Sequence, residues 1–103
     1  MNRPVRVIFA AEAVRQVREA GAWWLSNRDK APFAFDEELE KALDLIANQP
    51  SIGGRVNDVE LEGVRRLSLR RVRYLLYYRV SAKPEWVEVL GLWHMSRGKV
   101  PGF

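Results

Sequence analysis

The sequence contains no cysteine, a single histidine and no long apolar run, and each scarcity excludes a class of protein. Without cysteine there is no disulfide and no thiolate metal site, which suits a reducing compartment. With His94 as the one histidine, a zinc site is not expected. No apolar run approaches the ~18 residues of a membrane-spanning helix, and the N-terminal segment lacks the apolar core of a signal peptide. We therefore expect a soluble cytoplasmic protein with no cofactor and no membrane partner.

The length and composition are those of one globular domain. The chain has 103 residues, of which 48% are hydrophobic. A chain of this length can bury roughly two thirds of its unfolded surface, which is enough for one core. We therefore predict a single domain over residues 1–103. The closing segment RGKVPGF, residues 97–103, is predicted to be a loose C-terminal tail.

Charge is distributed unevenly along the chain. Residues 1–62 hold 8 lysines and arginines against 11 acids, a net −3, whereas residues 63–103 hold 9 against 2, a net +7. A basic half of this kind indicates an anionic partner, such as nucleic acid or an acidic polypeptide. The alternative is a surface that is basic for solubility alone.

The hydrophobic periodicity predicts two helices and four strands. Alternation predicts a strand over 5–9, and a helical stripe from about Ala11 includes Val14, Val17, Gly21, Trp24 and Leu25. A second helix is expected to begin after Pro32 and to stop at Asn48. Residues 51–62 are predicted to be loop, followed by strands over 64–69, 72–80 and 86–93.

These elements predict an α+β fold in the order β-α-α-β-β-β. Three consecutive strands suggest an antiparallel sheet, and the two helices form a hairpin that covers one of its faces. The other face is expected to stay partly open. Side chains expected to be buried between the hairpin and the sheet are those of Val14, Val17, Trp24, Leu39, Leu43 and Ile46.

The segment GVRRLSLRRVRYLLYYRV, residues 63–80, combines six arginines with residues that favour strands. If 72–80 is one strand, alternate side chains face opposite ways, so Val72, Tyr74, Leu76, Tyr78 and Val80 form core. The other face then presents a cationic and aromatic surface to a partner. Its predicted partner-binding residues are Arg71, Arg73, Leu75, Tyr77 and Arg79. The alternative is a solvated face on which the arginines pair with Glu60, Glu62, Glu85 and Glu88.

Few other side chains suggest a catalytic or binding role. A lone histidine such as His94 is more often structural than catalytic. A catalytic triad could be written with Ser68 or Ser96, but no nucleophile-elbow motif accompanies them. Among the four tryptophans, Trp23 and Trp86 are candidates for exposed contact.

Four motifs in order resemble those of the RelE/ParE superfamily of bacterial toxins from type II toxin–antitoxin operons. They are ALDLIANQPSIGGRV at the end of the hairpin, then GVRRLSL, YLLYYRV and the closing VEVLGLWHMSR, and the resemblance covers Val7 to about Gly98. It implies a compact α+β toxin that an antitoxin segment neutralises. RelE-like members cut mRNA on the ribosome, whereas ParE-like members poison DNA gyrase.

Within the superfamily, the sequence resembles the ParE-like members more closely. The long hairpin with its WWLSNRDKAP junction is similar to theirs, and the sheet has neither a tyrosine after Tyr78 nor a lysine before Lys83. The resemblance therefore implies inhibition of DNA gyrase by contact, with an antitoxin whose C-terminal segment wraps the toxin as the second partner. The arginine face with Arg71, Arg73 and Arg79 predicts that this segment is acidic.

Two alternatives stay open. In a RelE-like nuclease acting on the ribosome and mRNA, His94 would be the acid or base, with Arg66, Arg79 and Arg97 as phosphate-stabilising cations. A third possibility is an inactive relative that binds only its antitoxin.

Overall fold

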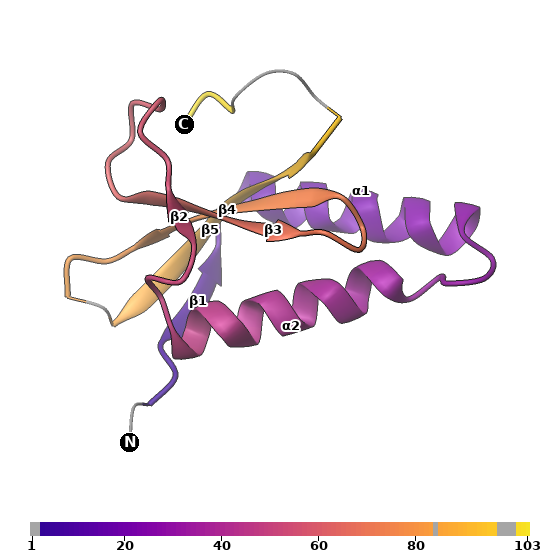
Figure 1. The fold of residues 1–103 in the computed structure, drawn as a ribbon, viewed down its shortest axis with the longest axis horizontal. Coiled ribbons are helices and arrows are strands. Elements are labelled where there is room, and N and C mark those ends of the chain that lie inside the picture. Colours follow the sequence, from indigo (N-terminus) through magenta and orange to yellow (C-terminus); the bar gives the residue numbers. More distant parts are fainter. Residues whose placement is uncertain (1–2, 84, 97–100) are drawn as a thin grey trace.

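The chain folds into one sheet with a helical hairpin packed against it (Figure 1). The computed structural model describes residues 3–83, 85–96 and 101–103. The elements are β1 Arg6–Phe9, α1 Ala11–Asn27, α2 Ala34–Asn48, β2 Gly54–Arg55, β3 Val64–Leu69, β4 Tyr74–Val80 and β5 Trp86–His94. The predicted α+β fold is confirmed, and the predicted order is changed only by the two-residue strand β2 within the expected loop.

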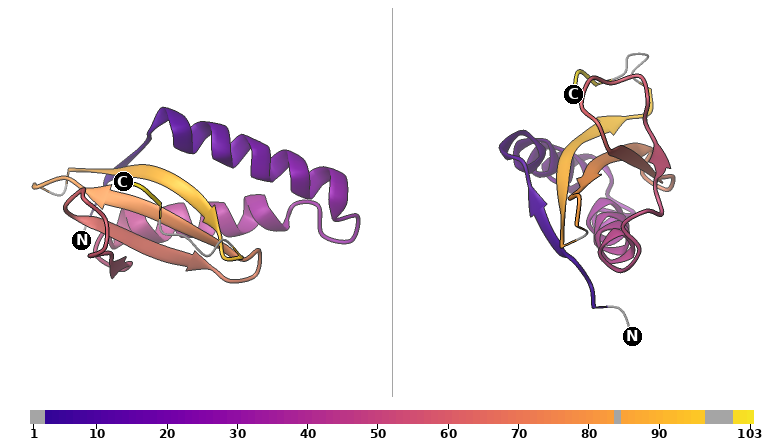
Figure 2. Two further views of the ribbon diagram at one scale, coloured as in Figure 1. Left: turned by 90° about the horizontal axis from the view of Figure 1, so that it is seen from above. Right: turned by 90° about the vertical axis from the view of Figure 1, so that its left-hand side faces the viewer.

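The described strands form a five-stranded sheet in the order β1-β5-β4-β3-β2. The three long strands β3, β4 and β5 are antiparallel neighbours, as predicted. Strand β1 pairs in parallel with β5, from Arg6 opposite Trp86 to Phe9 opposite Val89. The two helices lie on one side of this curved sheet, and the C-terminal residues lie on the other (Figure 2).

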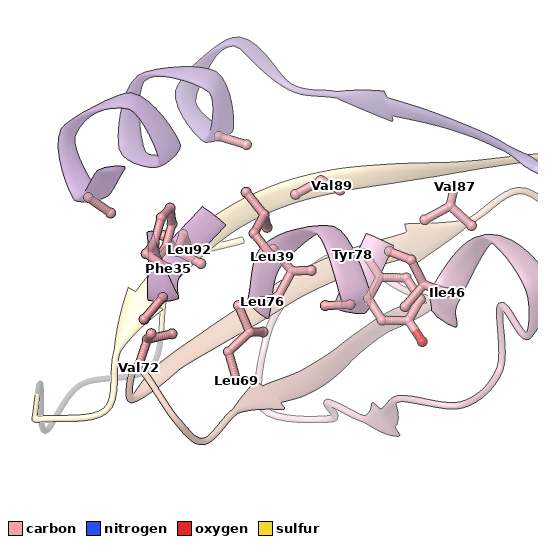
Figure 3. Close-up of a cluster of buried hydrophobic side chains, with 14 residues drawn as sticks. Phe35, Leu39, Ile46, Leu69, Val72, Leu76, Tyr78, Val87, Val89 and Leu92 are labelled. Atoms are coloured by element: carbon pink, nitrogen blue, oxygen red, sulfur yellow. The ribbon is translucent and has the colours of Figure 1, made fainter. Parts of the chain in front are cut away.

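The main core lies between the hairpin and the sheet. Helix α2 turns one stripe inward, and its buried residues are Ala34, Phe35, Leu39, Ala42 and Ile46. They pack on the inward side chains of the sheet and of the β3–β4 turn, among them Leu69, Val72, Leu76, Tyr78, Val87, Val89 and Leu92 (Figure 3). Asp36 and Glu37 in the first turn favour the positive end of the helix, as the sequence indicated.

Helix α1 packs through smaller residues than its sequence pattern indicated. Leu39 and Ile46 are buried as predicted, while Val17, Trp24 and Leu43 are partly buried against the core. Val14 is half-buried, and the buried residues of α1 are Ala13 and Ala20. Leu25, which the stripe placed inward, is 59% exposed. The inward stripe is thus rotated by about one residue, because the two alanines face the sheet.

The prediction that a strand begins at residue 72 is wrong. Strand β3 ends at Leu69 and β4 begins at Tyr74, so Arg71 and Arg73 lie in the turn. The backbone N–H groups of Val72 and Arg73 both donate to the Leu69 carbonyl, at 3.3 and 2.8 Å. Arg73 completes this turn with φ of 65°, a left-handed conformation that L-residues rarely adopt. Local alternation cannot predict such a turn, because Val72 is buried in the turn just as it would be in the predicted strand.

Close contact between the Tyr78 hydroxyl and the backbone of Gly53 and Pro50 fixes the loop between α2 and β3. The backbone N–H of Gly53 donates to the Tyr78 hydroxyl at 2.8 Å, and this hydroxyl donates to the Pro50 carbonyl at 2.8 Å. Arg65 donates to the carbonyl of Gly53 at 2.7 Å. Burial raises the pKa of the Tyr78 phenol, so it is neutral and can serve as both donor and acceptor at physiological pH.

The face of the sheet away from the helices is partly covered by the end of the chain. Phe103 lies against Tyr77, with ring centroids 5.3 Å apart, and Pro101 is buried. The backbone N–H groups of Glu60 and Leu61 donate to the Phe103 carbonyl, at 2.9 and 3.2 Å. The tail prediction for 97–103 is not tested over 97–100, which lie outside the described residues, whereas Phe103 packs its ring against Tyr77 of the sheet.

Two absences hold for the part of the chain that the structure describes. No helix there is both long and apolar enough to cross a membrane. Nor do three or more histidine, aspartate or glutamate side chains gather there in a way that could hold a metal ion.

Candidate functional site

A groove opens where the end of α1, the β3–β4 turn and the end of β5 meet. Its volume is about 330 Å³, and its lining is aromatic and cationic. We call it the aromatic groove, and its residues are Trp23, Trp24, Arg28, Arg71, Val72, Arg73, Tyr74 and His94. Trp23 is 46% exposed, so an aromatic surface is available to a partner.

Helix α1 is held against β5 by a side chain that completes the sheet edge. Pairing with β1 ends at Val89, so beyond this point β5 has no neighbouring strand on that side among the residues that the structure describes. Gln16 reaches across from α1, and its Oε1 accepts the Leu92 backbone N–H at 2.8 Å. This bond satisfies a backbone donor and fixes the position of α1, and so of the two tryptophans that follow.

The two tryptophans and an arginine form one stacked unit at the end of α1. The rings of Trp23 and Trp24 meet edge to face, with centroids 5.9 Å apart. The guanidinium carbon of Arg28 lies 5.2 Å from the Trp23 ring centroid and 5.5 Å from that of Trp24. Cation–π attraction of this kind holds Arg28 at the groove while leaving its N–H groups available to an anion.

Tyr74 connects the groove to the core. Its ring packs edge to face against Phe35 on one side and His94 on the other, with centroids 5.3 and 5.0 Å apart. Burial raises the pKa of the Tyr74 phenol, and a hydrogen-bonding interaction with the Trp24 side chain partly offsets this. The phenol is therefore neutral at physiological pH, and through Tyr74 the floor of the groove is continuous with the core.

His94 is oriented by the residues that follow it. Its Nδ1 accepts the Ser96 backbone N–H at 3.1 Å and lies 2.7 Å from the Ser96 hydroxyl oxygen. Because Nδ1 acts as an acceptor here, the neutral ring carries its proton on Nε2. The His94 ring thus has a fixed orientation and forms an aromatic wall of the groove, with Nε2 as its remaining donor.

The predicted partner-binding residues do not form one face. Arg71 and Arg73 reach the aromatic groove from the turn, where Arg71 also pairs with Glu37 at 3.0 Å. Leu75 and Tyr77 belong to the opposite face of the sheet, and Tyr77 is 2% exposed beneath Phe103. Arg79 lies toward the far end of β4 from the groove.

Arg79 is already neutralised by a neighbour on β5. It donates to Glu88 at 3.0 Å and stands 6.0 Å from the Trp86 ring centroid. For Arg79 the paired-arginine alternative is therefore confirmed. Whether the other predicted residues bind a partner stays a prediction.

The residues of the nuclease alternative are also spread out. Tyr74 is opposite His94. Arg79 lies five residue steps further along β4, at a distance of about 17 Å from Tyr74. Arg66 is opposite Tyr77, so its side chain is on the face away from His94. Arg97 lies outside the described residues. The structure thus brings His94 together with Arg71 and Arg73, not with Arg66 and Arg79.

Sequence reasoning missed four residues of the groove. Trp24, Val72 and Tyr74 were assigned to the core alone, and Arg28 was given no role. Trp23 was expected to be a candidate for exposed contact, and it is 46% exposed. The available signal was the pair Trp23-Trp24 at a helix end, since adjacent residues lie about 100° apart around a helix and two large adjacent rings rarely fit the same narrow apolar stripe. No local signal places α1 beside the β3–β4 turn.

One family model, described as "ParE toxin of type II toxin-antitoxin system, parDE", matches residues 7–98. The chain belongs to this family. No curated protein sequence matches it significantly. Among solved structures, this ParE-family toxin is similar to a chain of the chromosomal ParDE system of Pseudomonas aeruginosa. The TM-score is 0.69 at 18% identity, covering 92% of this chain and 100% of that one.

Structures of RelE-type toxins, in complex or isolated, have the same fold. A chain of the RelBE2 toxin–antitoxin complex of Mycobacterium tuberculosis matches with a TM-score of 0.63 and 24% identity, covering 88% of this chain and 98% of that one. The isolated RelE toxin of E. coli matches with a TM-score of 0.65 and 18% identity, covering 92% of this chain and 88% of that one. Because ParE and RelE structures score alike, fold similarity does not separate the two activities.

The left-handed Arg73 yields a test of the turn in this ParE-family toxin. We expect Arg73→Gly to raise the free energy of unfolding by up to about 1 kcal/mol, because glycine adopts this conformation without a Cβ penalty. Arg70→Gly, one turn position without positive φ, should instead lower it by about 0.5–1 kcal/mol. Urea denaturation of both variants measures the difference. Equal losses in the two would show that Arg73 is not left-handed.

Proposed function

We propose that this ParE-family toxin acts in the cytoplasm by binding and inhibiting DNA gyrase, and that its antitoxin neutralises it. The observation that supports this is the aromatic groove. Exposed Trp23 beside Arg28, Arg71 and Arg73 is the composition of a protein contact site, in which tryptophan and arginine anchor a partner. Such a toxin needs contact area rather than a reaction centre.

The scattered nuclease residues also favour inhibition by contact. Cleavage of RNA through the 2′-hydroxyl needs cations around one phosphate next to an acid and a base. Here Arg79 is engaged by Glu88 and Arg66 is on the other face, so neither can share a phosphate with His94. The observation that favours the RelE-like alternative is that His94, Arg71 and Arg73 line one groove.

The charge of the groove supports neutralisation by an acidic antitoxin segment. Arg73 forms no ion pair with any described residue, and the Arg71 pair with Glu37 is half-exposed, so both can exchange partners. Charge complementarity of this kind chiefly speeds association, whereas the apolar contacts set the dissociation rate. We propose that the antitoxin's acidic C-terminal segment covers this groove.

A pair of assays separates the proposed function from its alternative. We expect the purified toxin to inhibit DNA supercoiling by gyrase and to leave ribosome-bound mRNA intact. His94→Ala should reduce gyrase inhibition less than tenfold, because His94 supplies a wall of the groove rather than a proton transfer. Ser96→Ala, which removes only the hydroxyl near His94 Nδ1, is the matched control. Cleavage of mRNA that disappears in His94→Ala with an unchanged unfolding curve would establish the nuclease instead.

A further inference from the structure

A second groove adjoins the aromatic groove on the other side of Trp23, Tyr74 and His94. Its volume is about 430 Å³, and those three residues belong to both grooves. Helix α1 contributes Glu12, Arg15, Gln16 and Glu19, and β5 contributes Leu92 to the opposite wall. We call it the acidic groove, since its two carboxylates outnumber its one guanidinium.

The two grooves differ in the sign of their charge. The aromatic groove holds Arg28, Arg71 and Arg73. In the acidic groove, Arg15 is shared by Glu12 and by Glu19, the latter at 2.6 Å. The hydrogen bond from Arg15 holds the pKa of the Glu12 carboxyl below its ordinary value, so this carboxylate is charged at neutral pH. The combined surface is thus cationic at one end, aromatic in the middle and weakly anionic at the other.

We propose that the two grooves together bind one polypeptide segment with an acidic end, an aromatic or aliphatic middle and a basic end. This deepens the proposed function and rests on it, because the occupant we assign is the antitoxin's neutralising segment. Its acid meets Arg73 and Arg28, its apolar side chain lies against Trp23 and Tyr74, and its lysine or arginine meets Glu19. A purely acidic segment would satisfy only one of the two ends.

The same polarity argues against a single-stranded nucleic acid in this position. A nucleic acid carries one phosphate per nucleotide, so a strand that follows both grooves brings negative charge to Glu12 and Glu19 as well as to the arginines. Stacking on Trp23 and Tyr74 would favour a base, but like charges at the acidic end oppose the rest of the strand. A polypeptide avoids this repulsion because its backbone carries no net charge. The sign of its charge can therefore differ from one side chain to the next.

Short peptides test this charge order directly with the full chain. The probes are acetyl-Asp-Asp-Leu-Phe-Lys-Lys-amide, the same peptide with both lysines changed to aspartate, and hexathymidylate. Binding is followed by tryptophan fluorescence, since Trp23 and Trp24 line the groove. We expect the mixed-charge peptide to bind about three- to fivefold more tightly than the acidic peptide, the effect of an exposed ion pair, and hexathymidylate to bind most weakly.

Two double variants with the same change in net charge show where the preference originates. Glu12→Gln with Glu19→Gln should abolish the preference for the mixed-charge peptide. Glu40→Gln with Asp44→Asn, on the outer surface of α2, should retain it. Arg73→Gly should weaken the binding of both peptides about three- to fivefold. Unfolding curves of all variants confirm that the fold is kept.

The outcomes are separable from those of the gyrase assay. No binding of the mixed-charge peptide, or equal binding of the two peptides by the wild-type toxin, would overturn the inference. Tighter binding of hexathymidylate would assign the grooves to nucleic acid instead. If the peptide preference is found and gyrase is not inhibited, the proposed target fails while the specificity of the groove stands.

Discussion

Replacing Phe35 with alanine should lower the free energy of unfolding by about 3–5 kcal/mol. The Phe35 ring is fully buried between the hairpin and the sheet, so its loss leaves a cavity that a rigid core closes poorly (Figure 3). For a domain of this size, the loss corresponds to a decrease in Tm of at least about 12 °C. Thermal and urea unfolding measure it.

Phe33 provides a matched control two residues away. Its side chain is 59% exposed, so Phe33→Ala should change the free energy of unfolding by no more than about 0.5 kcal/mol. Similar losses of unfolding free energy in the two variants would contradict the burial of Phe35 between α2 and the sheet. Since Phe35 supports the Tyr74 ring, Phe35→Ala should also weaken binding at the aromatic groove under conditions where the variant is still folded.

Replacing Gly53 with alanine is expected to cost about 2–5 kcal/mol. A Cβ at this position would lie 2.6 Å from the Tyr78 hydroxyl oxygen and 2.9 Å from the Arg66 carbonyl oxygen, which is closer than these atoms can approach. The loop must therefore move away from β3 and β4. That movement breaks the bonds that the Tyr78 hydroxyl makes to Gly53 and Pro50.

The adjacent glycine is the control for this substitution. A Cβ at Gly54 meets nothing within 4 Å, so Gly54→Ala should be neutral or stabilise the protein by up to about 1 kcal/mol. Tyr78→Phe in the Gly53→Ala background should restore only part of the loss, because the ring edge still lies 2.8 Å from the new Cβ. A Gly53→Ala variant as stable as Gly54→Ala would refute the close approach.

The sequence by itself determined both helices, the four longer strands and their order, but neither β2 nor the start of β4. The stripe with Leu39 and Ile46 predicted the inward face of α2, and a run of strand-favouring residues after a glycine-containing loop predicted β3 with its observed bounds. These predictions succeeded because helical periodicity and strand-favouring composition are both visible within a single segment. The closing motif through His94 likewise indicated the family that the comparison then showed.

The tertiary structure alone decided which of these residues share a site. Arg71 and Arg79 looked equivalent by alternation, yet a tight turn carries Arg71 to the groove, while a Glu88 on another strand neutralises Arg79. The groove joins residues 23–28 to 71–74 and to His94, segments whose neighbourhood depends on how the hairpin packs across the sheet. Packing of this kind is set by side chains distant in the chain, such as Gln16 on Leu92, and leaves no period in the local sequence.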